Sequence, residues 1–132
     1  MYFTANAPEL GIVGIPGNQY SKGLSDHGDQ FYVQASTDAA GTPSYTWGTV
    51  VRNFDGSLTP TSRGTADSGS FNQANRTISV TISQSKLNAY LASVSRPALV
   101  EHSVLCGLRG DASSASLALE DATRGGTQFT LP

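Results

Sequence analysis

The densest group of reactive side chains in this sequence is the run Asp26-His27-Gly28-Asp29. Loop carboxylates, together with backbone carbonyls, are typical ligands of calcium, and imidazole is a ligand of softer metals. Asp26 and Asp29 are therefore candidate ligands of a structural calcium ion. The run also fits a loop that caps the following strand through Asx turns. We expect no cofactor, with this structural calcium as the alternative.

The two histidines, His27 and His102, are the candidates for acid–base catalysis. Either could be combined on paper with one of many serines into a Ser/His/Asp triad. No serine, however, occupies the Gly-x-Ser-x-Gly motif that places a nucleophile on a strained strand-to-helix turn. We therefore expect no catalytic residues and no enzymatic activity; a small hydrolase that uses either histidine is the competing hypothesis.

Four aromatic residues could offer flat rings to a sugar, because such rings stack on the apolar faces of pyranoses. These candidate ligand-binding residues are Tyr20, Tyr32, Tyr45 and Trp47. Tyr32 is out of phase with Phe31 and Val33, so we expect it to be exposed. Trp47 and Tyr45 have a second interpretation as core residues of a β-sheet, and for Trp47 core burial is favoured.

Charge and composition exclude some classes of partner. The chain has eight basic and ten acidic residues, a net charge of -2, and its arginines are scattered. Nucleic-acid binding, which needs clustered basic residues, is not expected. The longest apolar stretch, Leu10 to Ile15, is far too short to span a membrane. The single cysteine, Cys106, forms no intrachain disulfide and is expected to be a small buried hydrophobe.

Alternation of polar and apolar residues predicts the elements that must position these side chains. Strands with one buried face are expected over 29–37, 44–53, 58–63, 69–72, 77–82, 100–109 and 127–131. Asp55-Gly56 and Asn72 to Asn75 supply turn chemistry between strands. Leu87, Tyr90 and Leu91 share one face of a short helix near 83–91, with Ser83 or Ser85 as its cap.

These elements predict an all-β fold: an antiparallel β-sandwich, immunoglobulin-like or jelly-roll-like, of about seven to nine strands with one short helix. We expect a single domain over residues 1–132. The N-terminal residues carry neither a basic region nor an apolar signal core. An export signal would then lie outside this chain, which we expect to be part of a larger extracellular protein.

Several motifs resemble β-sandwich accessory modules found toward the C-terminus of large secreted bacterial and archaeal proteins. The motifs are Tyr-Thr-Trp-Gly-Thr from Tyr45, Asn-Phe-Asp-Gly-Ser-Leu from Asn53, Arg-Thr-Ile-Ser-Val-Thr-Ile from Arg76, and the late Leu-Cys-Gly-Leu-Arg-Gly. The resemblance implies an extracellular or cell-surface accessory module. It carries over no catalytic residues.

The favoured hypothesis is a non-catalytic module that binds a polysaccharide or a protein surface, or acts as a spacer. The alternative is a self-assembling subunit of an extracellular filament or a virion. Exposed edge strands would then pair with neighbouring copies or accept a donated strand. The segment from Tyr2 to Ile15 is the candidate donor in that hypothesis.

Overall fold

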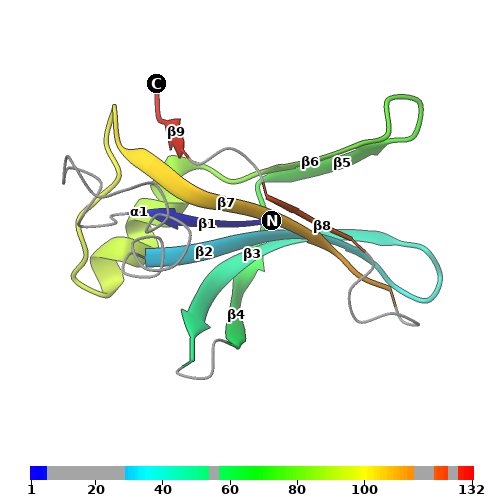
Figure 1. Cartoon of the computed structure of the whole chain (residues 1–132), viewed down its shortest axis with the longest axis horizontal. Helices are drawn as coiled ribbons and strands as arrows, with labels where there is room; N and C mark the ends of the chain where they lie inside the picture. The colour runs from blue at the N-terminus through cyan, green and yellow to red at the C-terminus, as the bar shows by residue number, and fades with distance from the viewer. Residues whose placement is uncertain (6–28, 54–56, 115–120, 125–127) are drawn as a thin grey trace. The chain divides into compact units, whose positions relative to one another are not determined.

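The computed structural model describes residues 1–5, 29–53, 57–114, 121–124 and 128–132 (Figure 1). These residues contain nine strands and one helix, and the strands form two largely antiparallel sheets. The sandwich-like all-β architecture with one short helix confirms the predicted fold class. The chain divides into two compact units, residues 1–31 with 100–132 and residues 32–99. That the two units act as one domain remains a prediction.

In the first unit, β7 is the central strand. The strands of this unit are β1 (Tyr2–Ala5), β7 (Val104–Ala112), β8 (Asp121–Arg124) and β9 (Gln128–Thr130). Strand β1 pairs with β7, and both β8 and β9 pair with β7 as well. Cys106 lies opposite Thr4 of β1 and also opposite Gln128 of β9. Because a strand residue has one neighbour on each side, β7 has partners along both edges.

Aromatic stacking forms part of the core of this unit. Phe3 is 6% exposed and Phe31 only 1%. Their rings stack with centroids 5.5 Å apart and an interplanar angle of 24°. Ala5 and Cys106 are buried as well. The alternating sequence pattern predicts strands with one buried face, and burial of apolar side chains such as these is the main source of their stability.

Strand β7 begins four residues later than the sequence predicts, because Val100 to Ser103 forms a turn instead. The N–H of Ser103 donates to the carbonyl oxygen of Val100 at 3.0 Å. The hydroxyl oxygen of Ser103 accepts from the N–H of Val100 at 2.8 Å. His102 has φ 66, in the left-handed region. Periodicity alone misses this turn because it contains neither glycine nor proline.

The second unit contains β3 (Pro43–Arg52), β4 (Leu58–Thr65), β5 (Ser68–Asn72) and β6 (Thr77–Thr81), together with most of β2 (Asp29–Thr37). Strands β3 and β4 pair from Thr46 opposite Thr65 to Arg52 opposite Leu58, which confirms the predicted hairpin. The predicted Asp55-Gly56 turn lies outside the described residues. Strand β4 is the last in its sheet, and it contains Pro60, a residue that sheets accommodate on edge strands or at bulges.

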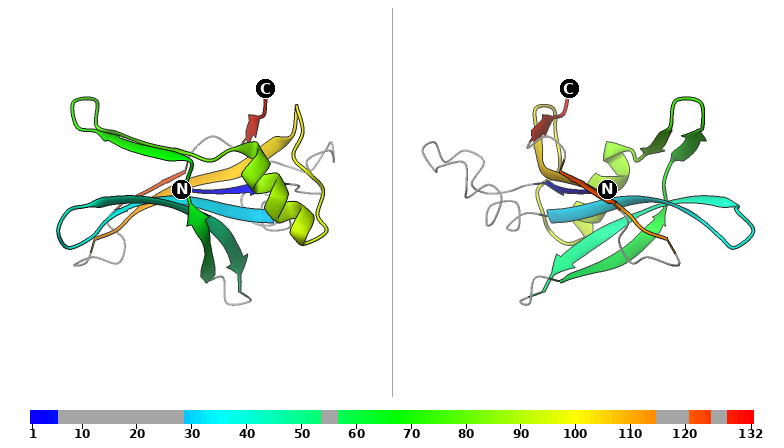
Figure 2. Two further views of the ribbon diagram at one scale, coloured as in Figure 1. Left: turned by 180° about the vertical axis from the view of Figure 1, so that it is seen from behind. Right: turned by 45° about the vertical axis from the view of Figure 1, so that its right-hand side comes forward.

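The hairpin of β5 and β6 forms the smaller sheet and leads into the helix (Figure 2). Its strands pair from Ser68 opposite Thr81 to Asn72 opposite Thr77. The side-chain oxygen of Asn72 accepts the N–H of Asn75 at 3.1 Å, the turn chemistry that the sequence predicts. This hairpin is largely exposed.

Helix α1 spans Gln84–Ser93, close to the predicted 83–91. Ser83 occupies the N-cap position, but its side chain makes no capping bond. Leu87 and Leu91 are buried, as the helical spacing predicts. In the described part of the chain, no helix has the length and hydropathy that a bilayer crossing requires.

The C-terminus of α1 closes with a Schellman arrangement. The N–H of Ser95 donates to the carbonyl of Ala92 at 3.1 Å, and the N–H of Arg96 donates to that of Leu91 at 2.8 Å. Ser95 has φ 57, a conformation in which glycine is the usual residue. The helix therefore ends here without a glycine, and Ser95 adopts a left-handed backbone conformation that is unfavourable for a residue with a Cβ.

Candidate functional site

Three of the residues that the sequence singles out for chemistry lie outside the described residues: Tyr20, Asp26 and His27. Asp29 begins β2, but its side chain also lies outside the described part. Among the described residues, no three His, Cys, Asp or Glu side chains gather as a metal site requires. The structural calcium ion therefore remains a prediction about Asp26 and Asp29.

Two of the described aspartates, Asp38 and Asp111, bond within their own turn or strand. Oδ1 of Asp38 accepts the N–H of Ala40 at 2.9 Å and that of Thr42 at 2.8 Å. The bond from Thr42, with the others around it, lowers the pKa of Asp38. Asp111 accepts from Nε of Arg109 at 2.8 Å. These carboxylates have structural partners.

His102 and Cys106 occupy opposite environments. Nε2 of His102 lies 3.5 Å from Oε1 of Glu101, in a contact between two side chains that are 79% and 73% exposed. Cys106 is buried, and desolvation raises the pKa of its thiol. The prediction that Cys106 is a small buried hydrophobe is confirmed.

Tyr32 is buried, which overturns the expectation that it is exposed. It is only 7% accessible, although the preceding Phe31 is buried too. The ring lies against Gly48 of β3, where a Cβ would come within 2.5 Å of its Cε1 atom. The neighbouring strand thus leaves room for an aromatic ring on the side that periodicity assigns to water. Alternation identifies two faces of a strand, but it does not reveal that both are covered.

Tyr45 and Trp47 lie on one face of β3, as their spacing predicts. The half-buried ring of Tyr45 lies so close over Gly69 of β5 that a Cβ there would overlap it. Trp47 is 5% exposed and meets Tyr90 of α1 edge-on, with centroids 6.5 Å apart and planes at 82°. Core burial of Trp47 is confirmed. That the four aromatics bind a ligand remains a prediction.

A β-bulge on β4 places an arginine on the same face as Trp47. Trp47 is opposite Gly64, and the next residue, Gly48, is opposite Ser62. Arg63 is therefore the extra residue, without a partner on β3. Gly64 has φ 136, which other residues rarely adopt. Bulges turn a side chain toward a direction that regular pairing would not allow, and they are frequent beside functional sites.

Four side chains meet at this bulge: Trp47, Thr49, Arg63 and Tyr90, which we call the Arg63 cluster. Nε of Arg63 donates to the hydroxyl oxygen of the buried Thr49 at 3.2 Å. Its Cζ lies 4.8 Å from the centroid of the Tyr90 ring, in a cation–π contact. Within the described residues, the terminal nitrogens of Arg63 have no hydrogen-bond acceptor. The guanidinium is thus held in place, and among the described residues its terminal N–H groups are not used.

The indole N–H of Trp47 is a second unused donor in the Arg63 cluster. No acceptor for its Nε1 is found in the part of the chain that the structure describes, although Trp47 is only 5% exposed. Buried Trp N–H groups normally have a partner. A Cβ on Gly64 would stand 4.0 Å from this nitrogen, so the indole N–H lies beside the glycine of the bulge.

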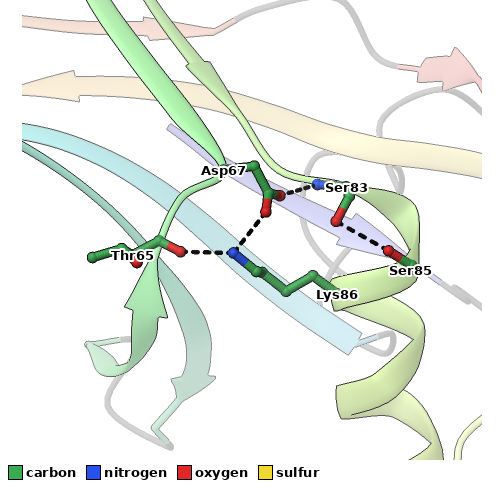
Figure 3. Close-up of polar contacts among 5 residues, drawn as sticks. All are labelled: Thr65, Asp67, Ser83, Ser85 and Lys86. Atoms are coloured by element: carbon green, nitrogen blue, oxygen red, sulfur yellow. Dashed lines mark hydrogen bonds and ion pairs between the residues drawn. The ribbon is translucent and has the colours of Figure 1, made fainter.

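A polar network fixes the start of α1 to the turn between β4 and β5 (Figure 3). Oδ2 of Asp67 accepts the N–H of Ser83 at 2.6 Å, and Oδ1 lies 2.8 Å from Nζ of Lys86. The same Nζ donates to the carbonyl of Thr65 at 3.0 Å. The hydrogen bond from Lys86, followed by that from Ser83, lowers the pKa of Asp67.

This network also positions the Arg63 cluster. Thr65 lies two residues after Arg63 on β4, and Lys86 lies one helical turn before Tyr90 on α1. Tying Lys86 to Thr65 therefore sets the spacing between Arg63 and Tyr90. The cluster rests on two regular elements that are joined at one end, which is how rigid sites are generally built.

The Arg63 cluster can supply hydrogen-bond donors of fixed position to an oxygen-rich or anionic group. The sequence identifies Trp47 but not the other three members as site residues. It shows Arg63 only as one of several scattered arginines. The available signal is Arg63-Gly64 near the end of an edge strand, where a left-handed glycine favours a bulge.

No protein family, curated protein or solved structure matches this chain. The resemblance to accessory modules of secreted proteins therefore remains a prediction, and the geometry of the described residues is the basis for any functional proposal.

Proposed function

We propose that this chain is a non-catalytic binding module of a secreted or cell-surface protein. The observation that carries the proposal is the Arg63 cluster: a guanidinium held by Thr49 and Tyr90 whose terminal N–H groups have no acceptor among the described residues. Unused donors of fixed orientation favour recognition of a ligand's oxygen atoms. The low content of charged residues, 14%, agrees with a role in which hydroxyls and amides make the surface contacts.

The test is direct binding to polysaccharides and to cell-surface preparations, combined with assays for turnover. Trp47 is the only tryptophan, and it belongs to the Arg63 cluster, so its fluorescence reports occupancy of this site. We expect saturable binding with a change in that signal and no consumption of the ligand. Turnover of an ester, peptide or glycan would overturn the non-catalytic proposal.

One observation favours self-assembly as a second candidate function. Phe71 and Ile78 lie directly opposite each other on the β5–β6 hairpin, and each is 62% exposed. The first part of the predicted donor segment, Tyr2–Ala5, pairs with β7 of its own chain, and the rest lies outside the described residues. Sedimentation velocity separates the candidates: concentration-dependent polymers that Phe71→Thr abolishes support assembly, and a monomer excludes it.

A further inference from the structure

We propose that the Arg63 cluster binds the carboxylate of a uronic-acid residue in an acidic polysaccharide. This inference rests on the proposed function and names the ligand class of the same site. It is argued from the free donors of the cluster, from its isolated charge and from the hydroxyl side chains beside it.

The guanidinium of Arg63 is already in place for a carboxylate. Its Nε bond to Thr49 and its position over Tyr90 fix both the plane and the direction of the group. The planar fork of a guanidinium matches the two oxygens of a carboxylate, and a side chain that is held in advance loses less entropy on binding. The hydrogen-bonded edge faces Thr49, which leaves the terminal nitrogens for a ligand.

The charge of Arg63 is not neutralised within the described residues. Two other cations of the described chain lie beside carboxylates: Arg109 is 2.8 Å from Asp111, and Lys86 is 2.8 Å from Asp67. Arg63 has an aromatic face and a hydroxyl instead. Within the described residues, the exposed guanidinium of Arg63 and the buried indole N–H of Trp47 are two donor groups of one cluster for which no acceptor is found. Such a site selects an anion that also accepts hydrogen bonds.

A sugar carboxylate fits better than a dense polyanion. The chain has a net charge of -2, which disfavours long-range attraction of nucleic acids or heavily sulfated polymers. One arginine recognises one carboxylate. Thr61 and Thr59 precede Arg63 on β4, opposite Thr49 and Val51 of β3, and both are exposed. Residues directly opposite each other share a face, so these hydroxyls lie on the face of the Arg63 cluster, where they can bond sugar hydroxyls.

The experiment titrates the purified chain with oligogalacturonides and with their methyl esters, which have the same sugars but no charge. Trp47 fluorescence and calorimetry report binding. We expect saturable binding of the acid form and affinity at least about tenfold lower for the ester, because a hydrogen bond to a charged group contributes about that factor. Arg63→Gln should lose a similar factor, and Arg63→Lys should recover only part of it. Arg76→Gln, in the exposed β5–β6 turn, is the matched control and should bind as the unaltered chain does.

Circular dichroism and thermal unfolding establish that Arg63→Gln is folded. Three results would each overturn the carboxylate site. The first is equal affinity for the acid and the ester, and the second is unchanged affinity in Arg63→Gln. The third is equal binding of neutral dextran and of dextran sulfate. If the chain binds a neutral polysaccharide or a protein surface and Arg63→Gln has no effect, the inference fails while the proposed function stands. If the chain instead turns a substrate over, the proposed function fails.

Discussion

The side-chain amide of Asn88 bonds both backbone groups of Leu99. Its Oδ1 accepts the N–H of Leu99 at 2.7 Å, and its Nδ2 donates to the carbonyl oxygen of Leu99 at 2.8 Å. Gln84 donates to the same carbonyl at 2.6 Å. A helix side chain thus provides the paired bonds that a neighbouring strand would otherwise make. Leu99, which is 1% exposed, is held against α1.

Replacing Asn88 with alanine should therefore destabilise the chain substantially. The N–H of Leu99 would lose its acceptor in a partly buried position, and an unsatisfied buried group costs about 1–3 kcal/mol. Urea unfolding followed by circular dichroism measures the loss. Gln73→Ala, in the exposed turn of the β5–β6 hairpin, is the control and should change stability little. Equal stability of the two variants would contradict the role of Asn88.

The contribution of Asp67 should depend on pH. Lys86 and Ser83 hold its pKa below the usual value of about 4. A group whose pKa is lowered by folding stabilises the folded state fully above its unfolded pKa and loses that effect as the pH falls through the lowered value. The melting temperature of Asp67→Asn should thus lie below that of the unaltered chain at pH 7, and the gap should shrink below about pH 4.

Thermal unfolding of both proteins from pH 7 to pH 2.5 tests this dependence on Asp67. Glu101→Gln serves as the control, because its side chain is 73% exposed and lies outside the network of Figure 3. A gap for Asp67→Asn that is constant across the range would show that the carboxylate's charge does not contribute.

Gly69 should tolerate alanine only if Tyr45 becomes smaller. A Cβ at position 69 would overlap the Tyr45 ring, and overpacking of this kind costs about 1–3 kcal/mol. In the double variant with Tyr45→Ala, the clash disappears. The free energy of unfolding of the double variant should then exceed the value expected from adding the two single effects.

Gly48 should behave differently in the same experiment. A Cβ there would meet the backbone carbonyl of Thr61 as well as the ring of Tyr32. Tyr32→Ala removes only the ring, so it should not rescue Gly48→Ala. Additive losses at Gly48, together with coupling at Gly69, are expected in urea titrations. Rescue at both positions would show that the backbone of β4 can move aside.

The thiol of Cys106 should be unreactive in the folded chain. It is 3% exposed, and burial raises its pKa, so little thiolate is present at pH 8. Ellman's reagent should label it slowly in buffer and rapidly in 6 M guanidinium chloride, a concentration chosen to unfold most domains. Fast labelling in buffer would contradict a closed core around β7.

Short stretches of the sequence are enough to predict the local elements of this chain. Alternation in Thr77 to Ile82 and the turn at Asn72 to Asn75 predict the β5–β6 hairpin, because pairing and turn involve neighbouring residues. The spacing of Leu87 and Leu91 predicts the buried face of α1 for the same reason. The four-residue error at the start of β7 arises at His102, whose left-handed backbone has no glycine to mark it.

The candidate site depends on contacts that no local pattern contains. Tyr32 is buried because Gly48 of a neighbouring strand leaves space for its ring, and periodicity in β2 holds no information about β3. Arg63 reaches Tyr90 because a bulge shifts the register of β4 and because Asp67 and Lys86 fix the helix beside it. By itself, the sequence determined strands, turns and one helix through local backbone preferences and side-chain alternation. Only the tertiary structure decided which side chains meet, because that depends on packing between segments distant in the chain.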